Sequence, residues 1–367
     1  MTAIVDIQQR LRRFAEVEAS GSPLYQHLAA HAAEDDDVMG LLTDAPDGFA
    51  APTLLLAAAH RALQAEPFHD LVNYYPSMGG SYGVDSGTWP LWRSFVVERA
   101  AKIRGIIAAH TTQTNEVRRA ALLFPAVAIA AKQAKKPIGL LEVGCSAGLL
   151  LDLGKYAYRY QTEAGQIVAG PTKTPLGLHC AVSFAPDAAF PTLPKKLAVA
   201  ARVGLDREPV DLGDEQAAAW LEACIWADQP ERQRLFSTAA AFQRKDPPEL
   251  IKGDAVADLS AAAERVPADA PLVLMTSHVL TYQSPQVRTE FFDAVEAIGR
   301  RRPLWWVSNE SYEAILERAL PGRDDLVPGD GEPVYGVLGF IRWDGGEPVA
   351  TALARTAPHG ERMTWLV

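Results

Sequence analysis

The segment from Glu142 to Gly148, Glu-Val-Gly-Cys-Ser-Ala-Gly, combines an acidic side chain with glycines in a short turn. Gly144 and Gly148 can adopt positive φ and let a ligand approach the backbone of the turn. We therefore include Cys145 and Ser146 with them as candidate binding residues. The alternative is a tight strand-to-helix turn that binds no ligand, because such turns recur in open α/β sheets.

The glycine spacing separates two kinds of ligand. A dinucleotide site requires Gly-x-Gly-x-x-Gly, but counting from Gly144 the second and third glycine positions hold Ser146 and Leu149. The segment instead resembles the turn of class I methyltransferases, which bind S-adenosylmethionine with an acid, any residue, and then Gly-x-Gly-x-Gly. Glu142, Gly144 and Gly148 match that register, and Ser146 replaces the middle glycine. This resemblance favours S-adenosylmethionine over NAD.

Further polar residues follow other expected strands, and open α/β sheets bind ligands beyond the carboxyl ends of their strands. Asp206 follows a strand over 197–203, and its two carboxylate oxygens match the two hydroxyls of a ribose. Asp254, after the next short strand, is expected to bind the adenine amino group. Ser277, after a strand over 271–276, adds a cofactor contact. The alternatives are a solvated loop residue for Asp206 and a helix cap for Asp254.

His278 follows the strand that is expected to face the transferred methyl group. The ordinary pKa of histidine suits a general base that accepts a proton from the nucleophile. Tyr282 is expected to orient this imidazole or to line the pocket. The alternative for His278 is a hydrogen-bonded structural role. We expect further contacts with the acceptor substrate from Asn115, Glu116 and Asn309.

These residues need a parallel sheet to bring them together. Residues 138–143 are typical of a buried strand and residues 149–158 of a helix, and strands and helices then alternate, which predicts right-handed parallel crossovers. Residues 156–196 interrupt this alternation and predict an inserted extension. Segments 335–343 and 348–356 predict a hairpin that adds an antiparallel strand. We therefore predict an α/β fold with a Rossmann-like class I methyltransferase sheet, parallel with a C-terminal antiparallel hairpin.

The chain divides into two predicted domains. Residues 1–135 consist of helical segments, with an irregular, glycine- and aromatic-rich loop over 73–90, and predict an N-terminal helical cap that forms the acceptor site. Residues 136–367 predict the methyltransferase-type domain.

The composition narrows the class of protein. The formal net charge is −10 and the pI is about 5.4, so a large phosphate-binding surface for nucleic acid is not expected. The three cysteines are far apart, so neither a disulfide framework nor a zinc site is expected. There is no apolar stretch long enough to cross a bilayer and no signal-peptide core at the N-terminus, so we expect a cytoplasmic protein.

The chain also resembles a bacterial family known as domain of unknown function 2332 over nearly its whole length. The resemblance rests on residues 114–117 (TNEV), 142–149 (EVGCSAGL), 202–206 (RVGLD) with Pro209 and Asp211, 225–229 (IWADQ), 252–255 (KGDA) and 277–282 (SHVLTY). As a set these motifs are specific, and they imply the domain layout and not a reaction.

The sequence therefore predicts a methyltransferase that uses S-adenosylmethionine and acts on a small molecule or a protein. A second hypothesis is a catalytically inactive α/β protein that binds a nucleoside or a protein partner. A third, an NAD(P)-dependent oxidoreductase, is disfavoured by Ser146 and Leu149.

Overall fold

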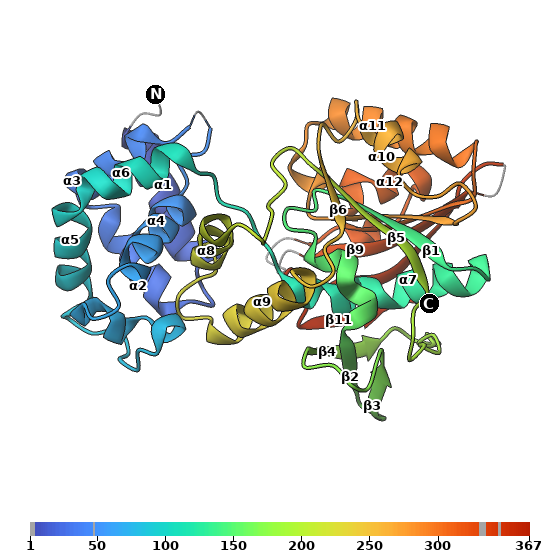
Figure 1. Ribbon diagram of the computed structural model, residues 1–367, viewed down its shortest axis with the longest axis horizontal. Coiled ribbons are helices and arrows are strands. Elements are labelled where there is room, and N and C mark those ends of the chain that lie inside the picture. Colours follow the sequence, from blue (N-terminus) through green and yellow to red (C-terminus); the bar gives the residue numbers. More distant parts are fainter. Residues whose placement is uncertain (1–3, 47, 330–334, 344–345) are drawn as a thin grey trace. The chain divides into compact units, whose positions relative to one another are not determined.

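The computed structural model describes residues 4–46, 48–329, 335–343 and 346–367 (Figure 1). The chain forms two compact units. The helical unit consists of Met1–Asn115 with Leu212–Ser237, and the sheet unit consists of Glu116–Asp211 with Thr238–Val367. Among the described residues, no helix has both the length and the apolar character required to cross a bilayer.

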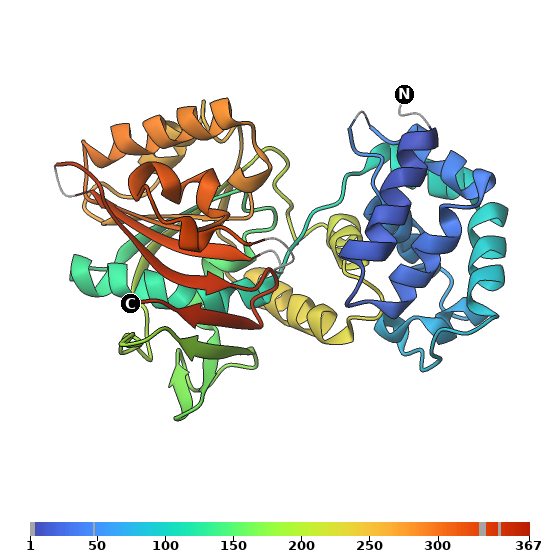
Figure 2. The ribbon, with the colours of Figure 1, turned by 180° about the vertical axis from the view of Figure 1, so that it is seen from behind.

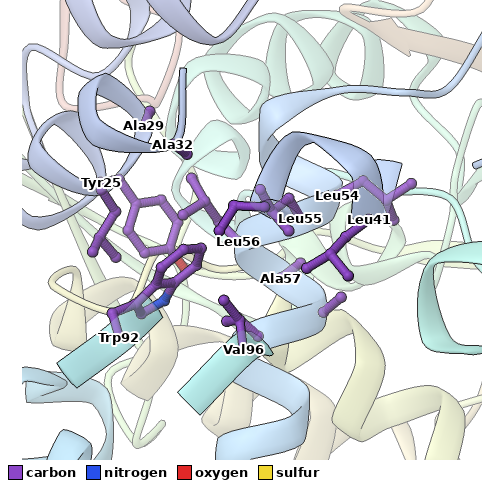
Figure 3. Packing of buried hydrophobic residues seen from close by; sticks show 14 of the residues in the cluster. Tyr25, Ala29, Ala32, Leu41, Leu54, Leu55, Leu56, Ala57, Trp92 and Val96 are labelled. Atoms are coloured by element: carbon purple, nitrogen blue, oxygen red, sulfur yellow. The ribbon is translucent and has the colours of Figure 1, made fainter. Parts of the chain in front are cut away.

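The helical unit has one apolar core. Figure 3 shows Tyr25, Trp92 and Val96 gathered around Leu55 and Leu56. Its helices are α1 (Ile4–Arg13), α2 (Pro23–Ala32), α3 (Asp36–Met39), α4 (Pro52–Gln64), α5 (Thr88–Glu98), α6 (Ala100–Ala109) and α8 (Glu215–Ala223), with shorter turns η1 (Phe14–Glu18), η2 (Gly40–Asp44), η3 (Asp70–Tyr74) and η4 (Pro76–Met78). α9 (Pro230–Gln243) runs from this unit into the sheet unit. The centre of the core is α4, which is buried on nearly all sides.

The segment 212–237 belongs to the helical unit although about a hundred residues separate it from the rest. Trp220 and Ala227 lie in the helical core. His60 Nδ1 donates to the Ala223 carbonyl oxygen over 3.1 Å, and Ser22 Oγ donates to the Asp228 carboxylate over 2.6 Å. The helical unit therefore differs from the predicted range 1–135. It includes 212–237, whose apolar and capping side chains complete its core, and it excludes residues 116–135, whose helix packs against strands of the sheet unit.

The sheet unit contains an 11-stranded mixed sheet in the order β3-β2-β4-β11-β10-β9-β8-β7-β1-β5-β6. The strands are β1 (Ile138–Val143), β2 (Ala157–Thr162), β3 (Gly165–Ala169), β4 (Gly177–Phe184), β5 (Val199–Asp206), β6 (Glu249–Lys252), β7 (Leu272–Ser277), β8 (Leu304–Glu310), β9 (Gly336–Trp343), β10 (Val349–Thr356) and β11 (Arg362–Trp365). Most neighbouring strands are parallel, so the predicted α/β class is confirmed.

Helices cover both faces of the central strands. In Figures 1 and 2, α10 (Leu259–Glu264) and α11 (Pro285–Gly299) lie on one face and α7 (Ala120–Ala134) on the other. All six residues of β1 are buried, as its continuous apolar run predicts for a strand covered on both faces. The remaining helical segments of the unit are α12 (Leu316–Ala319), η5 (Val117–Arg119), η6 (Leu149–Lys155), η7 (Leu280–Tyr282), η8 (Tyr312–Ala314) and η9 (Asp324–Leu326).

The predicted C-terminal hairpin is confirmed. β9 and β10 pair antiparallel, and β9 also pairs antiparallel with β8. The predicted extension forms β2, β3 and β4, which lengthen the same sheet beyond β11. Its buried and exposed residues alternate along β2, as expected of a sheet with one covered face.

The predicted helix over 149–158 is wrong. Only the seven-residue 3-10 helix η6 follows the glycine turn, and β2 begins at Ala157. The hydroxyls of Tyr156 and Tyr158 donate to the carbonyl oxygens of Leu149 and Leu153, which an extended α-helix would use itself. The tyrosine-rich sequence favours a strand, because aromatic residues suit a half-buried sheet surface.

Candidate ligand site at the carboxyl edge of the sheet

The glycine turn after β1 has three residues in the left-handed backbone region. Gly144, Ser146 and Gly148 have φ of 74°, 49° and 71°. These are the three positions that the Gly-x-Gly-x-Gly register reserves for glycine. A non-glycine residue in this region costs roughly 1–2 kcal/mol, so the turn holds Ser146 in a conformation that serine does not favour.

Asp206, the last residue of β5, stabilises this turn. One of its carboxylate oxygens accepts the Ser146 backbone N–H at 2.7 Å, and the other accepts the Glu208 backbone N–H at 2.9 Å. The hydrogen bond to Ser146 joins the end of β5 to the turn after β1. Each oxygen keeps a second lone pair for a ligand, because a carboxylate offers about four acceptor sites.

A cavity of about 190 Å³ opens beside Asp206 at the carboxyl ends of β1, β5, β6 and β7. The predicted residues Gly144, Asp206 and Asp254 line it, together with Gly253 and the apolar side chain of Val279. Its volume lies below the 300–1,000 Å³ of sites for whole drug-sized molecules. The cavity therefore suits one part of a ligand, such as a base or a nucleoside.

Asp254 has a local structural role as well. Its Oδ1 accepts the backbone N–H groups of Val256 and Ala257 at 2.9 and 3.1 Å, and its Oδ2 lies 3.3 Å from an Arg207 nitrogen. These hydrogen bonds hold the pKa of the Asp254 carboxyl below its ordinary value. Asp254 therefore stabilises the turn 254–257 and does not cap the next helix, whose N-cap residue is Asp258. Its side chain also lines the cavity.

The glycines of the turn serve packing. A Cβ at Gly148 would lie 3.0 Å from Leu250 Cδ2, and one at Gly144 would lie 2.2 Å from Val279 Cγ2. Protein side chains therefore take the space that we expected a ligand to need. Cys145 also fills space that a glycine leaves open: a Cβ added at Gly204 would lie 2.5 Å from the Cys145 Sγ. Burial raises the pKa of the Cys145 thiol well above its usual range, so it is an unreactive packing residue.

Glu142 is a buried acid with an unsatisfied oxygen. Its side chain is 4% exposed, and its Oε2 has no hydrogen-bond partner within the described residues. Burial, followed by the nearby Asp206 carboxylate, raises the pKa of Glu142 well above its usual range, and Arg119 opposes this effect. A buried polar atom without a partner costs free energy that a bound donor or acceptor would recover.

The loop after β7 contains His278, which has a left-handed φ of 54°. Its backbone N–H donates to the Asn309 carbonyl oxygen over 3.0 Å. Burial, and then the nearby Arg119 guanidinium, lower the pKa of the imidazole to about 3. Its Nε2 is buried and makes no hydrogen bond in the described part of the chain. His278 is therefore a half-buried imidazole, and its lowered pKa does not favour a general base.

Sequence reasoning missed the anchor of this loop, Glu310 at the end of β8. Its buried carboxylate accepts the backbone N–H groups of Val279 and Thr281 at 3.1 and 3.0 Å and the Thr281 hydroxyl at 2.9 Å. An acid at the end of an apolar strand is the signal that could have identified it. Glu310 holds the loop that closes one side of the cavity.

The other predicted residues are more dispersed. Tyr282 is 78% exposed. Within the described part of the chain, it forms no hydrogen bond with His278. Asn309 is fully buried and acts within the sheet, accepting the Thr356 hydroxyl at 2.6 Å and donating to Ser277 Oγ over 3.4 Å. The geometry therefore gives Asn309 a structural role.

Asn115 and Glu116 lie on either side of the boundary between the two units. Asn115 is half-buried, whereas Glu116 is buried and accepts the Arg118 backbone N–H at 3.1 Å. Glu116 Oε2 also lies 3.8 Å from His359 Nδ1. Arg119, which sequence reasoning did not single out, donates to the Pro358 and Ser277 carbonyl oxygens over 3.0 and 3.5 Å. It brings a buried cation to the end of β7.

The site therefore combines a nucleoside-sized cavity, a strained turn and buried acids. Among the described residues there is no cluster of three or more metal-binding side chains. No curated protein and no solved structure matches this chain. One family model, described as an uncharacterized protein conserved in bacteria (DUF2332), matches residues 8–365. Because this match spans nearly the whole chain, the protein belongs to that bacterial family.

Proposed function

We propose that the protein is a methyltransferase that binds S-adenosylmethionine at the carboxyl edge of its sheet. The observation that carries the proposal is the cavity that joins the turn after β1 to Asp206 and Asp254. In open α/β sheets, ligands bind at this edge. The three left-handed residues of the turn support the Gly-x-Gly-x-Gly register.

The strand directions add support for a methyltransferase-type sheet. The five strands β6, β5, β1, β7 and β8 are parallel, and β9 follows them antiparallel. A dinucleotide site instead uses the first turn of an α-helix for its pyrophosphate. The seven-residue 3-10 helix η6 is a poor substitute, so NAD(P) remains the less favoured cofactor.

The residues fit the nucleoside end of the cofactor. Asp206 has two free lone pairs for a ribose diol, Asp254 lines the cavity for an adenine amino group, and Glu142 has a buried oxygen without a partner. The other expected cofactor residues, Cys145, Ser146 and Ser277, do not line this cavity. S-adenosylmethionine supplies a methyl group on a cationic sulfonium centre. The protein's part is to align the acceptor and exclude water.

Calorimetric titration tests the proposal directly. We expect S-adenosylmethionine and S-adenosylhomocysteine each to bind with one site per chain, and NAD not to bind. Asp206→Ala should weaken binding about 10- to 150-fold, because a hydrogen bond to a charged group contributes roughly 1.5–3 kcal/mol. Glu208→Ala is the matched control, since that carboxylate pairs with Lys252 at 2.8 Å outside the cavity. Absence of heat with both cofactor forms would refute the proposal.

The half-buried imidazole of His278, with its lowered pKa and its Nε2 without a hydrogen-bond partner among the described residues, favours a second candidate, a nucleoside-binding protein without transferase activity. This candidate predicts that adenosine binds as tightly as S-adenosylhomocysteine, because only the nucleoside would be recognised. A transferase must also hold the methionine part of the cofactor. A tenfold or larger preference for S-adenosylhomocysteine over adenosine would therefore exclude the second candidate.

A further inference from the structure

A second and wider cavity, of about 630 Å³, lies on the extended part of the sheet. It is formed by β2, β4, β10 and β11 together with Tyr335, and most of its surface is apolar. Its volume falls within the 300–1,000 Å³ that is typical of small-molecule sites. None of the residues that line the nucleoside-sized cavity also lines this one.

The strand register places the floor of the cavity on one face of the sheet. Gln161, Ala181 and Arg362 form one cross-strand row through the pairing of β2 with β4 and of β4 with β11. Thr364 pairs with Arg355 of β10 in the next row. Arg362 precedes Thr364 by two residues, so its side chain leaves the sheet on the same face as that of Arg355.

The two arginines are therefore diagonal neighbours across β10 and β11. Such positions are separated by roughly 7–8 Å, which long side chains can span. Arg362 is exposed and forms no ion pair within the described residues. Two guanidinium groups can thus approach one anionic group at this end of the cavity.

Arg355 has a buried donor without an acceptor. Its Nη2 donates to the Asp325 carbonyl oxygen and lies 3.8 Å from the Asp325 carboxylate, and its guanidinium lies 5.5 Å from the centre of the Tyr335 ring. Its Nε is buried and has no hydrogen-bond partner among the described residues. An unsatisfied N–H beside a cavity is a place where a ligand oxygen would recover free energy.

We propose that this cavity binds a small molecule with an apolar body and an anionic group, held at that group by Arg355 and Arg362. The apolar part packs on Ala181, Ala357 and Pro358. The proposal is independent of cofactor binding at the other cavity.

Two fluorescent probes with the same rings test the proposal. 8-Anilinonaphthalene-1-sulfonate carries a sulfonate, whereas N-phenyl-1-naphthylamine is neutral. With the folded full-length protein we expect saturable binding of the sulfonate probe and at least tenfold weaker binding of the neutral one. Arg362→Gln should lower the affinity for the sulfonate probe at least fivefold and leave the neutral probe unchanged.

Arg159→Gln is the matched control, because Arg159 is an exposed arginine of β2 that does not line the cavity. It should leave both affinities unchanged. Ala181→Trp should block both probes by filling the cavity floor, with circular dichroism confirming that each variant is folded. Equal affinity for the two probes, or an Arg362→Gln variant that binds the sulfonate probe like the wild type, would overturn the proposal.

Discussion

Ser146 shows how much of the site a single residue can reveal. Its place in the Gly-x-Gly-x-Gly register was predictable from sequence, and its φ of 49° agrees with that register. Its hydrogen bond with Asp206 was not predictable, because 60 residues separate the two and only the pairing of β1 with β5 brings them together. Local spacing thus identified the turn, whereas its stabilisation depends on tertiary structure.

Glu142→Gln should stabilise the protein increasingly as the pH rises. The folded-state pKa of Glu142 is raised, so its contribution to stability is complete below the unfolded pKa of about 4.3 and is lost as pH rises toward the folded pKa. Glutamine removes this loss, which amounts to about 1.4 kcal/mol per pH unit within that window. Urea unfolding between pH 5 and 8 measures the difference.

The exposed residue Glu264 provides the control for that series. The difference between Glu264→Gln and the wild type should stay constant over the same pH range. A Glu142→Gln variant whose advantage does not grow with pH would show that the Glu142 carboxyl ionises normally in the folded protein.

His278 should remain neutral throughout the physiological range. Because burial and Arg119 lower the pKa of its imidazole to about 3, its ring resonances should not titrate between pH 5 and 8. Nuclear magnetic resonance of ring-labelled histidine measures this, and His278→Asn identifies the signal, since asparagine tolerates positive φ. A titration midpoint near 6.5 would restore the general-base hypothesis.

At the scale of elements, the loop after β7 depends on the end of the neighbouring strand. Glu310→Gln should lower the free energy of unfolding by roughly 1–3 kcal/mol, because an amide NH₂ in place of one carboxylate oxygen would face the Val279 backbone N–H, which lies 3.1 Å from both oxygens. Chemical denaturation measures the loss. Glu313→Gln, in the next turn and exposed, should change stability by less than about 0.5 kcal/mol. Equal effects of the two substitutions would argue against an anchoring role.

Strong periodicity made most elements of the sheet unit predictable. The apolar run of β1 and the hairpin of β9 and β10 were found close to their predicted positions. The segment after the turn was predicted wrongly. The spacing of its leucines favours a helix, but Gly154 and the tyrosines from Tyr156 onward favour its end and the start of a strand. Hydrogen bonds from the buried hydroxyls of Tyr156 and Tyr158 stabilise the observed structure, and these depend on tertiary packing.

At the scale of the whole molecule, the helical unit is discontinuous in sequence. A fragment of residues 1–115 should not fold cooperatively, because Trp220, Ala227 and the hydrogen bond from His60 to Ala223 would be missing. Thermal unfolding followed by circular dichroism measures this. Addition of a peptide of residues 212–237 should restore a cooperative transition. A sharp transition in the fragment alone would show that the late segment is dispensable.

This discontinuity also sets the order of events on the ribosome. The helical unit lacks the full segment 212–237, which contains α8, until residue 237 has been made, 122 residues after the first part ends at residue 115. At about 5–20 residues per second, translation needs roughly 6–24 s for that stretch. During this interval the apolar helices of residues 1–115 lack the segment 212–237 that completes their core. A chaperone that shields apolar helices during translation would therefore bind the nascent chain in this interval. It would leave once the segment 212–237 has emerged.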